Sequence, residues 1–171
     1  MRILLHKNFY KLYRNKKQQE RIINAIHFYI DEHKMRHYNY TLEILFDEKI
    51  FAHERTIALF YLNENRKRGH VGLRKNQKND ELINSIFHEI THFHQFLKGD
   101  LYDHRQKYFW RGKSFSKVNT STDYDTYYNF PWEIEARETA TETLKLFNKK
   151  YPLSLWDKLC NLWSKIYDES N

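Results

Sequence analysis

The order of apolar and polar residues predicts one helix and three strands in the first half of the chain. Apolar residues recur three and four positions apart over residues 17–35, as on the buried face of an amphipathic helix. Apolar and polar positions alternate over residues 40–47, which is typical of a half-buried strand. Residues 55–63 are apolar on both faces and predict a covered strand. After a polar turn, residues 70–74 predict a short returning strand.

Helical periodicity dominates the second half of the chain. A helix is predicted over residues 80–98, and it ends at Gly99, a usual helix-terminating residue. Pro131 favours the first turn of a further helix, which the pattern extends to about residue 149. Ser154 opens a sequence that resembles a capping box, so we expect a last helix to begin there.

The connection between these helices, residues 99–131, has no long periodic segment. A connection of this length has either a function or a structure of its own. Within it, residues 107–115 predict a hairpin that turns at Arg111–Gly112. A helix, a small sheet and then three helices together predict an α+β fold. Because no repeat or low-complexity linker divides the chain, we expect a single domain over residues 1–171.

Composition and charge restrict the class of protein without defining a function. No apolar run reaches the roughly 18 residues of a transmembrane helix. The apolar stretch near the start of the sequence is too short for a signal peptide. The single cysteine, Cys160, cannot form an internal disulfide, which favours a reducing compartment, the cytoplasm. The formal charge of +7 is compatible with nucleic acid as a partner. The basic residues are spread along the chain, however, as on an ordinary charged surface.

The strongest chemical signal is the motif HEITH at residues 88–92, inside the predicted helix. Two histidines four residues apart lie on one helical face, so the ring nitrogens of His88 and His92 can converge on one ion. Zinc accepts imidazole ligands in a tetrahedral site with one position open to water. The carboxylate of Glu89 is placed to act as a general base toward that water. The pattern is the HExxH motif, and its apolar neighbours predict a buried helix.

Two histidines do not complete a catalytic zinc site, which usually has three protein ligands. His94 points away from the first two histidines on the same helix, so the third ligand comes from elsewhere. The helix after Pro131 offers Glu133 and Glu135. At about 100° per residue, Glu133 falls in the middle of the apolar face, whereas Glu135 lies about 200° from it. A buried carboxylate needs a partner, and a metal ion is one, so Glu133 is the better ligand.

HExxH followed by a glutamate on a later helix resembles the gluzincin class of zinc metallopeptidases. The longer segments FHEITHFHQ (87–95) and PWEIEAR (131–137) are similar to small metallopeptidase-like proteins of bacteria and their phages. This resemblance covers about residues 70–147. It implies a minimal zincin-like domain that hydrolyses a peptide or protein, in the host cytoplasm if a phage encodes it.

The same resemblance implies His88, His92 and Glu133 as zinc ligands and Glu89 as the base. It also implies that an edge strand lines the cleft, and residues 70–74 are the candidate. A peptide can add to such an edge by backbone hydrogen bonds.

Three further residues are candidates for supporting roles. Tyr127 and Tyr128 precede the glutamate helix, and either can supply a donor to an oxyanion. Tyr128 is our candidate, and aromatic packing is the alternative for both. Gln95, one turn after His92, either hydrogen-bonds a ligand or the loop, or is a solvated polar residue.

We therefore expect a zinc-dependent peptidase. The alternative is a non-catalytic binding module that contains zinc or a vestigial site and acts through its basic surface on nucleic acid or a host protein. A third hypothesis is a host-interaction protein without metal. In that case Glu133 would be an acid of the first helical turn, stabilised by the helix dipole or by a buried basic partner.

Overall fold

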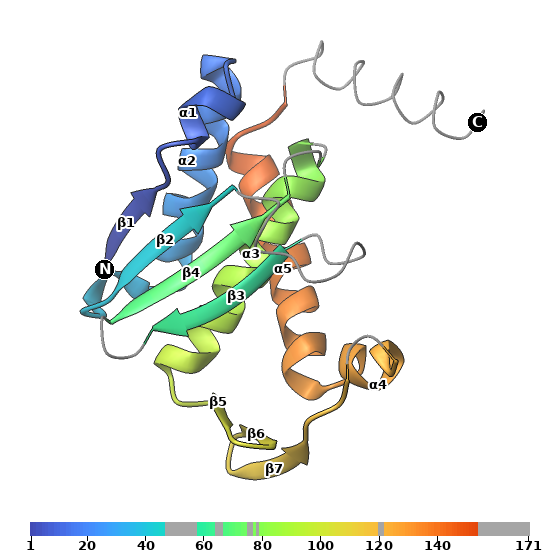
Figure 1. The fold of residues 1–171 in the computed structure, drawn as a ribbon. Coiled ribbons are helices and arrows are strands. Elements are labelled where there is room, and N and C mark those ends of the chain that lie inside the picture. Colours follow the sequence, from blue (N-terminus) through green and yellow to red (C-terminus); the bar gives the residue numbers. More distant parts are fainter. Residues whose placement is uncertain (47–57, 64–66, 75–76, 78, 120–121, 154–171) are drawn as a thin grey trace, which may run out of the picture.

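The structure is a computed structural model that describes residues 1–46, 58–63, 67–74, 77, 79–119 and 122–153. The described part combines helices with two small sheets and confirms the α+β class (Figure 1). The predicted last helix, from Ser154, lies outside the described residues. Within them, no helix is both long and apolar enough to cross a membrane.

The larger sheet has four strands in the order β1-β2-β4-β3. β1 (Arg2–Leu5) and β4 (Arg68–Leu73) are both parallel to β2 (Thr41–Leu45), and β3 (Ala58–Asn63) is antiparallel to β4. The three predicted strands correspond to β2, β3 and β4, and they are confirmed over the residues that the structure describes. β1 was not predicted, because its four residues are too few to show a period.

The expectation that residues 70–74 form an edge strand is wrong. Residues 70–73 belong to β4, which is hydrogen-bonded to β2 on one side and to β3 on the other. The strands follow one another as β2, β3 and β4 in the sequence, but β4 inserts between the other two in space. In the described part of the chain, β3 is therefore the edge strand at this side of the sheet.

Three long helices cover one face of this sheet (Figure 1). They are α2 (Lys16–Glu32), α3 (Asn79–Leu97) and α5 (Pro131–Lys150), and they confirm the three predicted helices. α3 is central, because it contacts β3, β4, α2 and α5. Several faces of this helix are therefore covered, and its buried apolar residues are Leu82, Ile83, Ile86, Phe87, Ile90 and Phe93. The short helix α1 (Phe9–Leu12) and the 3-10 helix η1 (Met35–His37) were not predicted.

The connection between α3 and α5 has a structure of its own. It forms an antiparallel sheet of β5 (Leu101–His104), β6 (Lys107–Trp110) and β7 (Lys113–Ser116), followed by the short helix α4 (Tyr124–Tyr128). The predicted hairpin is confirmed, and both residues of its turn, Arg111–Gly112, have positive φ angles of 46° and 82°.

A second hydrophobic cluster joins the small sheet to the start of α5. Trp110, Phe130 and Trp132 are buried in it, and partly buried residues from β6, β7 and α4 pack against them. The rings of Phe130 and Trp132 are stacked with centroids 4.4 Å apart. This cluster fixes the first turn of α5 beside the C-terminal half of α3.

Gly69 of β4 lies close against a side chain of α3. A Cβ at residue 69 would lie 2.7 Å from ring atoms of Phe93, which is itself fully buried against Phe60 and Tyr40. We expect Gly69→Ala to lower the free energy of unfolding by about 1–3 kcal/mol, because the ring has no room to move. Urea unfolding would measure this change. Ser114→Ala, at an exposed strand position, is the control, and equal stabilities of the two variants would contradict the packing described.

Candidate metal centre

α3 presents His88 and His92 one turn apart on the same face. The two Nε2 atoms are 3.1 Å apart, and the ring planes are nearly perpendicular at 88°. His92 is 7% exposed, and the side chain of His88 is 21% exposed. The four-residue spacing therefore brings the two nitrogens together, as the motif predicts.

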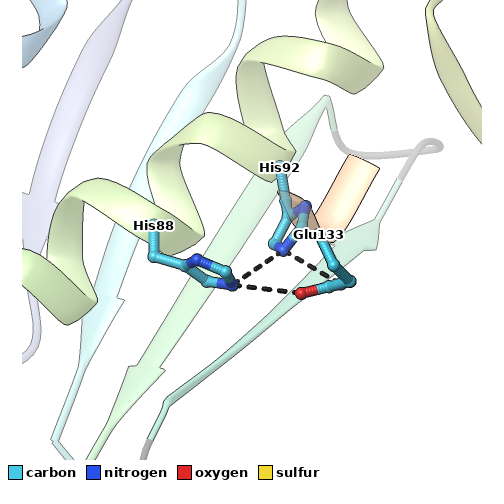
Figure 2. A group of neighbouring side chains, drawn as sticks. All are labelled: His88, His92 and Glu133. Carbon is cyan, nitrogen blue, oxygen red and sulfur yellow. Dashed lines mark hydrogen bonds and ion pairs between the residues drawn. The ribbon is translucent and has the colours of Figure 1, made fainter. Parts of the chain in front are cut away.

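Glu133 reaches these histidines from the first turn of α5. The helix begins after Phe130, and Pro131 occupies its first turn, where a missing N–H costs no hydrogen bond. The Oε2 atom of Glu133 lies 3.3 Å from Nε2 of His88, and Oε1 lies 3.2 Å from Nε2 of His92 (Figure 2). These three side chains form a group that can hold a metal ion.

Glu133 lies on the buried face of α5, as the helical wheel predicts. It is 4% exposed, and Ala136 and Ala140 are fully buried on the same face. Their small side chains allow α5 to approach α3 closely, which carries the carboxylate to the histidines. Glu135, the other candidate, points elsewhere and is paired with Arg111 at 2.6 Å.

The carboxylate of Glu133 has no lysine or arginine partner among the described residues. Its ion pairs there are with the two histidines, and Oε1 is buried without a well-aligned hydrogen bond. Burial alone would raise the pKa of Glu133, but His92 and His88 together lower it well below the usual range. The buried basic partner required by the metal-free hypothesis is therefore a pair of imidazoles, both of which are also metal ligands by type.

The pKa of His92 is shifted by the same contact. Burial lowers this pKa, and the neighbouring Glu133 carboxylate outweighs burial and raises the pKa to about 9. A ring held between Glu133 and Gln95 is therefore protonated at neutral pH when no metal is bound.

Glu89 lies beside the metal-ligand group of His88, His92 and Glu133, but it makes none of the contacts that join these three side chains. It is 6% exposed, and burial raises the pKa of its carboxyl, an effect that His88 and His92 partly offset. The Glu133 carboxylate raises the pKa of Glu89 further. Glu89 makes no hydrogen bond or ion pair with another described residue, so its carboxylate remains available for a proton.

Of the two candidate tyrosines, Tyr127 is the one that faces the group. Burial and the nearby Glu133 carboxylate raise the pKa of Tyr127 far above the usual range. Tyr128 is 42% exposed, and the Arg137 guanidinium lies 3.5 Å from the centroid of its ring. Both belong to α4, and the helical turn points them in different directions.

Gln95 hydrogen-bonds a ligand, which is one of the alternatives that its spacing allows. Its Oε1 lies 2.9 Å from Nδ1 of His92, and its Nε2 donates to the carbonyl of Trp132 at 3.0 Å. Nε2 also lies 3.4 Å from Oε1 of Glu135, whose other oxygen accepts from Arg111. Sequence spacing gave no signal for the contacts of Glu135 and Arg111, because they join a hairpin turn to a helix.

Comparison with family models, with curated proteins and with solved structures found no match.

The raised pKa of His92 predicts that metal binding releases a proton. Below the unfolded value of 6.5 the ring is protonated in both states, and its ion pair with Glu133 stabilises the metal-free fold. This contribution is lost as the pH rises through about 9. At pH 7.5 we expect zinc to displace about one proton from His92, so that zinc affinity increases with pH up to about 9. Calorimetry in buffers of different ionisation enthalpy measures the proton count. Binding without proton release would contradict this account.

Proposed function

We propose that the protein is a zinc-dependent peptidase of the gluzincin type. His88, His92 and Glu133 would hold the zinc ion, and Glu89 would act as the general base. The observation that carries this proposal is the convergence of two Nε2 atoms and one carboxylate in a buried place, with a second carboxylate beside them.

The type and proximity of the three ligand residues support zinc as the metal. The two Nε2 atoms lie 3.1 Å apart, and each faces a different oxygen of Glu133, at 3.2 Å for His92 and 3.3 Å for His88. One ligand atom from each residue lies within 4.8 Å of the others, which is close enough for a single ion. Two imidazoles and one carboxylate are also a donor set of catalytic zinc sites, which keep a fourth position open.

Zinc bound there would supply Lewis acidity, which polarises a substrate carbonyl and acidifies a water molecule. Glu89 would take one proton from this water as the water oxygen adds to the carbonyl carbon. The same proton would then pass to the leaving amine as the carbon–nitrogen bond breaks. The raised pKa of Glu89 suits this role, since a base with a pKa nearer neutrality both accepts and returns a proton.

Tyr127 is better suited than Tyr128 to stabilise the oxyanion. Tyr127 lies near the Glu133 carboxylate, and its raised pKa keeps its hydroxyl protonated and able to donate to an oxyanion. Tyr128 is exposed and stacks its ring on Arg137.

The resemblance and the position of β3 support a peptide as the substrate. β3 contacts α3 and has one unpaired edge among the described strands. An extended peptide that pairs with this edge would lie alongside the helix that carries His88 and His92. The edge that would receive the substrate is thus β3 and not β4.

The alternative function is a binding module that acts through the basic surface of the chain on nucleic acid or a host protein. The two functions differ in what they require of Glu89. A binding module needs no proton acceptor beside the metal, whereas a peptidase does.

Replacing Glu89 tests the proposed function. We expect Glu89→Gln to keep its zinc and its fold but to hydrolyse a library of internally quenched peptides about 10²–10⁴-fold more slowly than wild type. Glu138→Gln, an exposed carboxylate on α5, is the matched control and should retain activity. Zinc-loaded wild type that cleaves no peptide would favour the binding module, and full activity of Glu89→Gln would exclude this carboxylate as the base.

A further inference from the structure

Gln95 occupies a buried position between one ligand of the candidate metal centre and the first turn of α5. It is 2% exposed and lies on α3, three residues after His92. Its amide oxygen faces Nδ1 of His92, and its amide nitrogen faces the Trp132 carbonyl and the Glu135 carboxylate. Both ends of the amide therefore have defined partners.

The partners of the amide nitrogen determine which way the side chain points. A backbone carbonyl and an ionised carboxylate only accept hydrogen bonds, so the NH2 group of Gln95 must face Trp132 and Glu135. A flipped amide would set its oxygen against two acceptors. The oxygen is therefore left for His92, and an amide oxygen also only accepts.

It follows that Nδ1 of His92 must be the donor in the 2.9 Å contact. We propose that Gln95 is a positioning residue that keeps the proton of His92 on Nδ1, so that the lone pair of Nε2 is free for the metal. The neutral imidazole carries one proton, and a proton held on Nδ1 leaves Nε2 as the acceptor atom. Nε2 is the atom that faces His88 and Glu133.

Glu135 and Arg111 hold Gln95 in this orientation. Arg111 donates to Glu135 at 2.6 Å, and its guanidinium carbon lies 4.4 Å from the centroid of the Trp110 ring. The backbone N–H of Arg111 donates to the carbonyl of Asp100 at 2.7 Å, just after α3 ends. The turn of the small sheet therefore contacts Glu135 through Arg111. This contact keeps the Glu135 carboxylate beside the amide nitrogen of Gln95.

This inference rests on the metal ligands of the proposed function but not on hydrolysis. Outer partners of ligand histidines typically change metal affinity by about 10–100-fold when they are removed. Zinc affinity is therefore the readout, and catalytic activity is not needed.

The experiment compares zinc affinities of the full-length chain by competition with a chromophoric chelator. We expect Gln95→Leu to bind zinc about 10–100-fold more weakly than wild type. The double variant Gln95→Glu with Glu135→Gln keeps an oxygen that can accept from His92, although its other oxygen at position 95 then faces the Trp132 carbonyl. It should therefore bind zinc more tightly than Gln95→Leu but more weakly than wild type, and an affinity no better than that of Gln95→Leu would contradict a role for the acceptor.

Nitrogen-15 NMR of the zinc-loaded wild type provides the second readout, because ring-nitrogen shifts distinguish a protonated Nδ1 from a protonated Nε2. A proton on Nδ1 of His92 is expected. A metal-bound Nδ1, or unchanged zinc affinity in Gln95→Leu, would overturn the role of Gln95 while leaving the zinc site intact. Wild type that binds no zinc would overturn the proposed function and this inference together.

Discussion

The carboxylate of Glu133 lies in the protein interior at 4% exposure, where an unpaired charge is costly. The packing of α5 on α3 forces it there, since the alanines that allow close approach share its face of the helix. The aromatic cluster around Trp132 fixes the start of this helix. Two imidazoles are its ion-pair partners among the described residues, so three side chains of metal-ligand type meet around a buried charge.

The parts of the site that depend on helical spacing were predictable from the sequence. His88 and His92 share a face because four residues make about one turn. The burial of Glu133 follows from the same helical rotation of about 100° per residue, which places Glu133 on the apolar face and Glu135 away from it. The choice between Tyr127 and Tyr128 was not predictable in this way. They lie on α4, a helix of five residues, which is too short to show a period.

The parts of the fold that depend on pairing between distant segments were harder to predict from the sequence. Three strands of the larger sheet were recognisable from their residue patterns, but the order of the strands in the sheet was not predictable. β4 pairs with β2, although β3 lies between these two strands in the sequence. β1 and β5 are four residues each and carry no readable pattern. The contact of Arg111 with Glu135 depends on a hairpin that meets a helix, and sequence spacing contains no information about such a meeting.

The central claim is that two histidines and Glu133 form one metal site, and elemental analysis of purified protein tests it most directly. The account predicts about one zinc per chain in wild type and in Glu138→Ala, an exposed position on the same helix. It predicts a clear loss of zinc in Glu133→Ala, with the fold retained by circular dichroism. Absence of zinc from wild type after refolding with the metal, or undiminished zinc in Glu133→Ala, would contradict the account.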